Sequence, residues 1–406
     1  MAQGGPVTSI DPRQYGVVVF LVFEPGVRLL GPNGDVLSVY ALAVGLPCVL
    51  AAFALVVRRY TGDDGRRLLL LAVLWLSSVP LLYVVAQRMV DAWQLLFLSL
   101  ALFLFTGSAR ARAFVGLPLA AATLTKLLPA FLLLYLLVRS PRAGLLGVGG
   151  VGALLAIGQL HYGPLLGFGY PIWLLTSGGE SVARWSTHFE NNSIRGLLYK
   201  LAAGFRLEAD SSAYVLPAAW LPTLNVLAYG AAAVLVAYVL VVAWRGRGRD
   251  DVVRRSVELC LAVVTMLLVS PHTAQDYTVV TLPVLAVGVY LAARGLPRPW
   301  TPAACVLGGL AAVLIGVFVP MNVMARLVQL GPLLGLTHNA YNPLLTEGGG
   351  SPGLGAYDFF GFPGLGLLLA WVLFVRLERL TAQPRSLVPA AETTSATLLA
   401  APHVSR

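Results

Sequence analysis

The run AFVGLPLAAATLTKLLPAFLLLYLLV, residues 113–138, decides what kind of protein this is. It is almost wholly apolar, yet Lys126 lies within it and Pro129 follows three residues later. A helical span takes about 20 apolar residues, so the run is too short to cross a bilayer twice in full. Arginines flank both of its ends, which places both ends on one face of the membrane. We predict two half-length helices that enter and return, with the turn near Thr125, Lys126 and Pro129; the alternative is a single crossing with a weak charge signal.

The rest of the chain shares this apolar character. Of its 406 residues, 58% are hydrophobic and 11% are charged, and the mean hydropathy is +0.79. Soluble domains average roughly 25% charged and 45–50% apolar residues, so a soluble enzyme and a disordered chain are excluded. Ten-residue segments of alternating polarity are lacking, which excludes an outer-membrane barrel. We expect an all-α polytopic membrane protein, because a helix satisfies its own backbone hydrogen bonds in lipid.

Arginine placement predicts the topology. Nine further runs are long enough, or nearly so, to cross the membrane: 36–57, 68–86, 91–107, 143–160, 215–244, 252–270, 277–293, 299–319 and 361–376. Nineteen of the 28 basic residues fall in short loops or the tail on one face, which the positive-inside rule assigns to the cytoplasm. The net charge of +10 therefore reflects topology, and no nucleic-acid partner is expected. The long polar loops, at 1–35, 87–91, 161–214, 271–276 and 320–360, then lie on the outer face.

This layout divides the chain into three regions. Residues 1–35 form an extracytoplasmic N-terminal segment with a short apolar helix at 15–30, and no cleavable signal peptide is visible. Residues 36–376 form the transmembrane domain. Residues 377–406 are expected to be a disordered cytoplasmic tail. The three cysteines lie far apart in apolar runs and are interpreted as small core residues.

Lys126 is the most informative residue, because it is one of only two lysines and lies in an apolar run. A lysine at the centre of a spanning helix costs about 2.5–3.5 kcal/mol on insertion scales. A proline three residues on frees backbone carbonyls beside a water-filled site, which favours a cation that meets an anionic group such as a phosphate. The structural alternatives are that Lys126 snorkels to the interface or pairs with a buried acid.

Three outer clusters carry further polar groups. The segment RWSTHFENNSIRGLLYKL, 184–201, contains His188, Glu190, Asn191, Asn192, Ser193 and Arg195. Ser193 is placed to cap the helix that follows, and the alternative for the whole segment is an ordinary amphipathic surface helix. The segment SPHTAQDYTVV, 270–280, contains His272, Gln275 and Asp276, which would otherwise be helix caps or hydrated side chains. The turn VVAQRMVDAWQ, 84–94, contains Gln87, Arg88 and Asp91, and by itself is mostly a turn signal.

These clusters, in this order, resemble the polytopic mannosyltransferases that use polyprenyl-phosphate-mannose, glycosyltransferase family 87 of the GT-C superfamily. Ala86-Gln87-Arg88 stands at the family's Gly-Gln-Asn turn, and Lys126-Leu127-Leu128-Pro129 matches its Lys-x-x-Pro. Asn191 to Gly196 fits Asn-x-Ser-x-x-Gly, and Ser270-Pro271-His272 fits a Ser-Pro pair with a polar residue before a span. The likeness runs from about residue 15 to 376. It implies a GT-C-like bundle of about 9–11 transmembrane helices with long extracytoplasmic loops.

The resemblance also implies a catalytic carboxylate in the first outer loop, after a first crossing helix. Residues 15–30 are similar to the segment that follows that loop, so we expect either a translation start further upstream or the loss of the base. Asp11 and Asp35 are the remaining N-terminal acids and stand as the candidate catalytic residues.

On this resemblance, a mannosyl-type sugar moves from a polyprenyl-phosphate donor to a lipid-linked or extracellular glycan acceptor, with inversion. Lys126, Arg195 and His272 are the candidates for the donor phosphate, because cations stabilise a leaving phosphate. Gln87, His188, Glu190, Asn192 and Asp276 are the candidate contacts to sugar or acceptor. Membrane lipids are the other expected partners; no cofactor is expected and no metal ligands are assigned. We expect a plasma-membrane protein whose active face is extracytoplasmic. The alternatives are a flippase for lipid-linked sugars and a catalytically inactive GT-C-like subunit.

Overall fold

The computed structural model describes residues 15–31, 34–62, 64–86, 89–172, 186–206, 213–249, 251–293, 301–316 and 358–382. In these ranges the chain is helical and holds no sheet, apart from one isolated antiparallel bridge between His188 and Ala213. The predicted all-α class is therefore confirmed.

The helices follow one another through short connections in the first half of the chain. They are α1 (Val17–Leu30), α2 (Gly34–Tyr60), α3 (Gly65–Leu76), α4 (Val79–Ala86), α5 (Asp91–Phe105), α6 (Ala109–Ala113), α7 (Gly116–Thr123), α8 (Ala130–Arg139) and α9 (Pro141–Tyr162). The second half holds α11 (Ile194–Ala202), α12 (Leu221–Arg245), α13 (Val252–Val269), α14 (Leu282–Ala293), α15 (Thr301–Ile315) and α18 (Phe362–Ala382). Two 3-10 segments, η2 (Ala218–Trp220) and η3 (Gln275–Thr281), precede α12 and α14.

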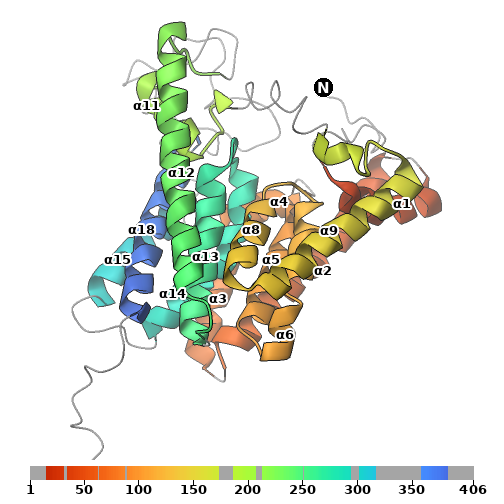
Figure 1. The fold of residues 1–406 in the computed structure, drawn as a ribbon, viewed down its shortest axis with the longest axis horizontal. Coiled ribbons are helices and arrows are strands. Elements are labelled where there is room, and N and C mark those ends of the chain that lie inside the picture. The colour runs from red at the N-terminus through yellow and green to blue at the C-terminus, as the bar shows by residue number, and fades with distance from the viewer. Residues whose placement is uncertain are drawn as a thin grey trace, which may run out of the picture.

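Helix α13 forms the centre of the bundle. Almost all of its side chains are buried, including those of Arg254, Arg255 and Glu258 near its start. It packs against α5, α8, α12, α14 and α18, which come from both halves of the chain, and Figure 1 shows it behind α12 and beside α8. A helix that is apolar over most of its circumference is stable only when it is surrounded in this way.

Four helical segments of the described chain are long and apolar enough to cross a membrane. Ser38–Tyr60, Pro141–Tyr162 and Ala218–Arg245 are only 22–28% buried within the protein, whereas Asp276–Ala293 is 72% buried. The first three therefore present most of their apolar surface outward, as a lipid-facing helix does. The other helices are shorter, broken or more charged, and the expected total of 9–11 spans stays a prediction.

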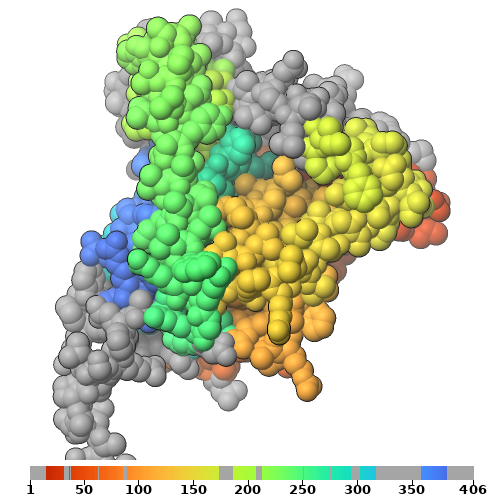
Figure 2. Space-filling model, in the orientation of Figure 1, coloured from red at the N-terminus to blue at the C-terminus, as the bar shows by residue number. Residues whose placement is uncertain are grey.

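Helix α12 carries the clearest marks of a lipid-facing span. Trp220, at its start, and Trp244, near its end, are 51% and 62% exposed. They are 24 residues apart, or about 36 Å along a helix, which brackets a hydrocarbon core of about 30 Å. Tryptophan is enriched at both membrane interfaces. Arg247 stacks on the ring of Trp244 at 3.9 Å from its centroid, so a basic side chain marks one end of α12. In Figure 2 this helix is the green column at the front of the molecule.

The run 68–86, which we expected to be one span, is divided in two. Helix α3 ends at Leu76, Ser77 and Ser78 interrupt it, and α4 begins at Val79. Pro80 explains the break, because proline has no N–H to donate to the carbonyl of Leu76 four residues back, whereas it is tolerated in the first turn of α4. The N–H of Val79 instead donates to the carbonyl of Gly316 at 3.0 Å, beyond the end of α15.

A buried ion network closes the arginine-bearing end of the bundle. The Glu258 carboxylate, which is fully buried, accepts Nε–H bonds from Arg139 of α8 and Arg254 of α13, each at 2.6 Å. Arg254 also approaches Glu378 of α18 at 3.4 Å. Because buried charges are stable only when they are paired and hydrogen-bonded, this network holds α8, α13 and α18 in one arrangement.

Glycines set how closely α7 approaches α9. A Cβ atom on Gly116 of α7 would lie 2.1 Å from the carbonyl oxygen of Ala143 and 2.5 Å from the nitrogen of Gly147, both in α9. The two backbones are therefore in direct contact, as small residues allow in membrane helix pairs. A Cβ atom on Gly149, which also belongs to α9, would instead meet open space, with no atom within 4 Å.

We expect Gly116→Ala to lower the thermal stability of the purified protein, because the α9 backbone must move to admit the methyl group. Overpacking of this kind costs about 1–3 kcal/mol. Gly149→Ala is the matched control and should leave the melting temperature unchanged or slightly raised, because alanine favours helix more than glycine does. Equal melting temperatures for the two variants would contradict the close α7–α9 contact.

Candidate active site

The break between α7 and α8 confirms the two predicted half-helices. Helix α7 ends at Thr123 and α8 begins at Ala130 after Pro129, and both pack against α9. The hydroxyl of Thr125 donates to the carbonyl of Ala121 at 2.9 Å, which satisfies one of the helix's terminal acceptors. The chain therefore returns through the turn at 124–129, and Lys126 lies in that turn.

The start of α1 packs directly on this turn. The backbone N–H groups of Gly16 and Val18 donate to the carbonyls of Thr125 and Leu124 at 3.2 and 3.1 Å. A Cβ on Gly16 would lie 2.2 Å from the Leu124 oxygen, so only glycine fits there. The N-terminal residues that the structure describes are thus part of the wall around Lys126.

Lys126 is held by two carboxylates from other helices. Its Nζ atom donates to Asp91 Oδ2 at 2.7 Å and Oδ1 at 2.9 Å, and to Asp276 Oδ2 at 3.1 Å. Asp91 is the first residue of α5 and Asp276 belongs to η3, so the ammonium ties three distant segments together. The side chains of Lys126 and Asp276 keep 11% and 12% of their surface exposed, against 1% for Asp91. The buried-acid interpretation of Lys126 therefore holds, and it does not exclude a ligand at the exposed edge.

Aromatic rings complete the surroundings of the ammonium. Nζ of Lys126 lies 4.0 Å from the ring centroid of Tyr277 and 5.9 Å from that of Tyr15. The ring of His272 meets Tyr277 edge-on, with 5.9 Å between centroids. Cation–π attraction of this kind is strongest where water is excluded. With both carboxylates ionised, the cluster of Lys126, Asp91 and Asp276 carries a net charge of −1.

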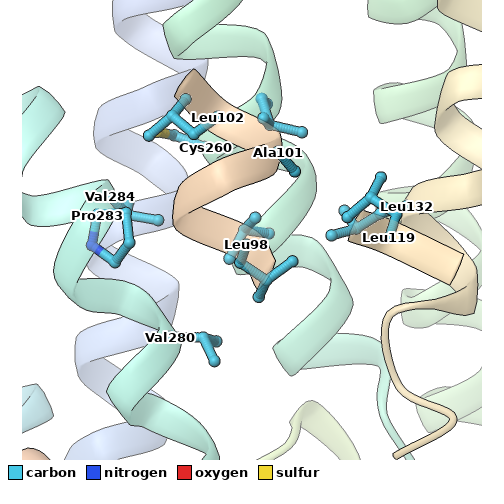
Figure 3. Close-up of a pocket in the computed structure, with 11 residues that line it drawn as sticks. Leu98, Ala101, Leu102, Leu119, Leu132, Cys260, Val280, Pro283 and Val284 are labelled. Carbon is cyan, nitrogen blue, oxygen red and sulfur yellow. The ribbon is translucent and has the colours of Figure 1, made fainter. Parts of the chain in front are cut away.

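Below this polar cluster the bundle encloses an apolar cavity. Leu98, which lines it from α5, follows Asp91 by two helical turns, and Val280 follows Asp276 by about one. Figure 3 shows Leu98, Leu119, Leu132 and Cys260 around it, from four different helices. The polar cluster therefore stands at one end of an apolar interior.

The loops 186–193 and 270–276 are joined by their own hydrogen bonds. The N–H of Asn192 donates to the carbonyl of Thr273 at 2.7 Å, and the N–H of Thr273 donates to Asn191 Oδ1 at 3.2 Å. Asn191 Nδ2 donates in turn to the carbonyl of Pro271 at 3.0 Å. Ser193 caps α11, as predicted, by accepting from the N–H of Gly196. Two of the predicted clusters are thus one structural unit, and Asp276 connects it to Lys126.

The second lysine of the chain is hydrogen-bonded to the same unit. Lys200 of α11 is 1% exposed, and its ammonium donates to Asn192 Oδ1 at 3.1 Å and to the carbonyl oxygen of Asp358. Asn192 Nδ2 donates to Asp358 Oδ1 at 2.6 Å. Burial lowers the pKa of Lys200 to about 7 and raises the pKa of the Asp358 carboxyl.

Glu190, His188 and His272 are the other titratable residues of these two loops. Burial raises the pKa of Glu190 to about 6, and the charge of Asp276 acts in the same direction. Burial lowers the pKa of His272 to about 4, so its imidazole is neutral at pH 7 and offers an N–H rather than a charge. His188 stacks on Phe189, with 4.9 Å between ring centroids.

Other predicted site residues lie elsewhere. Arg195 turns to α12: its guanidinium donates to Asn225 Oδ1 at 2.7 Å and to the Tyr199 hydroxyl at 3.0 Å, and it packs on the Tyr229 ring. No contact joins it to Lys126 in the described chain. Asp11 and Gln87 are outside the described residues, and Asp35 lies in α2 without a described side chain.

Sequence reasoning named Asp91 only as a polar residue of the 84–94 turn, and it did not single out Lys200, Asp358 or Tyr277 as site residues. The sequence offers a clue for Asp91, which is an acid at the start of an apolar helix, and for Lys200, which is the only other lysine. It offers no such clue for Asp358, which follows a glycine-rich stretch. In the part of the chain that the structure describes, no group of three or more His, Cys, Asp or Glu residues is arranged to hold a metal ion.

A comparison with protein-family models matches residues 15–271 to the model described as glycosyltransferase family 87, which covers more than half of the 406 residues. The match includes Lys126 and the turn at 191–193, and it ends before Asp276. Comparisons with curated proteins and with solved structures gave no match.

The ion pairs of Lys126 predict how the stability of the protein changes when their charges are removed one after another. Lys126→Met should lower the stability of the protein by about 3–5 kcal/mol, because Asp91 and Asp276 are then left facing each other without a cation. Adding Asp91→Asn to that variant removes one of the two charges and should restore part of the loss, which thermal melting in detergent would measure.

Arg110→Ala is the control for the loss of a single cation, because Arg110 is an exposed residue of α6. It should leave the melting temperature unchanged. A double variant no more stable than Lys126→Met would mean that the two aspartates are not coupled through the lysine.

Proposed function

Because the chain belongs to glycosyltransferase family 87, we propose that this membrane glycosyltransferase moves a mannosyl-type sugar from a polyprenyl phosphate to a lipid-linked or extracellular glycan acceptor. The observation that carries the proposal is the convergence at Lys126. Its ammonium lies 3.1 Å from Asp276, and the loop that holds Asp276 is bonded to the loop that holds Asn192. An ammonium, amide groups and carboxylates thus meet at one end of an apolar bundle, where a lipid phosphate with a sugar attached has its polar part.

The donor phosphate would meet Lys126 by replacing Asp276. Asp276 makes the longest of the three bonds to the ammonium, and both side chains keep some exposure. Asp91 holds Nζ through both oxygens and would stay in place. The ammonium then lies against the leaving oxygen as negative charge develops there, which lowers the barrier. A neutral His272, next to Tyr277, would add an N–H bond to the same group.

Removing the ammonium should remove sugar transfer. Lys126→Ala is expected to lower the transfer of radiolabelled mannose from polyprenyl-phosphate-mannose to a lipid and glycan extract of the source cells by at least about 100-fold. The stability-compensated variant Lys126→Met with Asp91→Asn should show the same loss, which separates chemistry from folding. Arg110→Ala should retain transfer.

The same assay separates the proposal from its rivals. A flippase would move the labelled donor across vesicle membranes without forming product, and an inactive subunit would do neither. Full turnover by purified Lys126→Ala would show that Lys126 is not needed to bind the donor phosphate.

We also propose that this site faces the outside of the plasma membrane. The helix ends that carry Arg110, Arg139 and Arg245 belong to α6, α8 and α12. Figure 1 places α6 and α11 at opposite ends of the molecule. Since positive residues stay in the cytoplasm, α11 and the loops bonded to it would be extracytoplasmic.

Cysteine labelling tests this orientation. With the three native cysteines replaced by alanine, Leu201→Cys, at a position of α11 that is 67% exposed, should react with an impermeant maleimide in intact cells. Arg66→Cys, at an exposed position at the start of α3, should react only after permeabilisation. The reverse pattern would invert the topology.

A further inference from the structure

We propose that residues 245–249, which we call the arginine turn, bind the phosphate group of an anionic glycerophospholipid in the adjoining leaflet of the membrane. The turn follows α12 and lies at the arginine-bearing end of the bundle, where α8 ends at Arg139. Lys126 lies in the turn before the other end of α8. The lipid site is therefore separate from the proposed active site, and it does not depend on the transfer of mannose.

The sequence of the arginine turn alternates arginine with glycine. It reads Arg245-Gly246-Arg247-Gly248-Arg249, and all three arginines are exposed. A Cβ atom on Gly246 would lie 2.5 Å from Oε1 of Glu258 and 2.7 Å from Nε of Arg139, so the backbone there lies directly against that buried ion pair. Gly248 has a φ of +72°, a left-handed conformation that glycine adopts without steric cost. The glycines thus bring the backbone against the bundle, while the arginines between them stay accessible.

Two hydrogen bonds fasten the arginine turn to the end of α8. Nη2 of Arg139 donates to the carbonyl of Arg249 at 3.0 Å, and Nε of Arg247 donates to the carbonyl of Val138. Arg139 is itself held by Glu258 in the buried ion network. The backbone that carries the exposed arginines is therefore fixed before a ligand arrives, which lowers the entropic cost of binding. A basic loop that only orients a protein in the membrane needs charge, but it does not need this fixed geometry.

Arg247 is held in a position that leaves its binding groups free. Its guanidinium lies over the ring of Trp244, 3.9 Å from the centroid, and its Nε–H is taken by Val138. Among the residues that the structure describes, its two Nη groups have no hydrogen-bond partner. A guanidinium offers its N–H groups as a planar fork that matches two oxygens of a phosphate. The remaining donors of Arg247 therefore suit a phosphate better than a single-point acceptor.

The charge around the arginine turn is not compensated by the described chain. Arg247 and Arg249 form no ion pair with a described carboxylate, and Arg142, the second residue of α9, is a further exposed cation without one. Of the nearby acids, Glu258 is occupied within the buried network and Asp251 caps α13. Clusters of arginine at the membrane surface attract anionic lipids, and basic sites between transmembrane helices bind their headgroups. An anion is thus the complementary ligand.

The apolar surroundings favour a lipid over a soluble phosphate. Trp244 is exposed in the last turn of α12, and tryptophan is enriched where the hydrocarbon meets the headgroups. Leu134 of α8, Leu145 of α9 and Val241 of α12 are also exposed, and each lies within about two helical turns of the arginine-bearing end. Figure 1 shows α8 between α12 and α9. Acyl chains would cover these side chains while the phosphate meets the arginines.

Lipid binding to the full-length protein tests the site. The purified protein is immobilised in detergent and equilibrated with radiolabelled phosphatidylglycerol or phosphatidylcholine that carry the same acyl chains. The wild-type protein should prefer phosphatidylglycerol, and added salt should weaken this preference because it screens exposed charge. The preference should fall about fivefold in Arg247→Gln and about 25-fold when Arg249→Gln is added. Binding of phosphatidylcholine should not change.

Glycerol 3-phosphate distinguishes a lipid from a soluble anion, because it carries the phosphate without the acyl chains. It should displace labelled phosphatidylglycerol only at a concentration at least about 100-fold higher than unlabelled phosphatidylglycerol requires, since buried methylene groups supply much of a lipid's affinity. Displacement by the two compounds at equal concentration would overturn the lipid assignment.

Arg66→Gln is the matched control, because Arg66 is an exposed arginine at the start of α3 and its loss changes the net charge equally. It should keep the full preference for phosphatidylglycerol. Arg249→Gln alone repeats the test without disturbing the stack on Trp244, since the Arg249 side chain makes no contact with the described chain. An equal loss in Arg66→Gln and Arg247→Gln, or a wild-type protein that binds the two lipids equally, would overturn the site.

Discussion

The charge cluster at the turn between α7 and α8 is the interaction on which the site depends. An unpaired lysine among apolar helices costs about 2.5–3.5 kcal/mol, and Lys126 avoids that cost only because Asp91 and Asp276 reach it. Those partners come from α5 and η3, so a single ammonium fixes the positions of both segments relative to the turn between α7 and α8. Once η3 is fixed, the loop at 270–276 is fixed too, and the loop at 186–193 is bonded to it. The half-helix turn thereby positions two loops that it does not itself form.

The two ends of the bundle use buried charge differently. At the arginine-bearing end, Glu258 accepts from Arg139 and Arg254, and all three side chains are almost fully buried. These buried charges pair with one another, so the network has a structural role. At the other end, Lys126 and Asp276 keep an exposed edge, and Glu190 is more open still. Since perturbed and partly exposed ionisable groups gather where function needs them, the asymmetry supports an enzyme that works at one face.

The sequence predicted what depends on length and local pattern. The return of the chain at 113–138 followed from a run too short to cross twice, and the Ser193 cap followed from its place before an apolar helix. The partners of Lys126 did not follow, because Asp91 and Asp276 lie 35 and 150 residues away and no local pattern links them. Arg195 was misjudged for the same reason: its guanidinium is directed by Asn225 and Tyr229, about thirty residues on, and not by its place in the first turn of α11. The break at Ser77 was visible in principle, since Pro80 follows it and lacks the N–H that a continuous helix would need there.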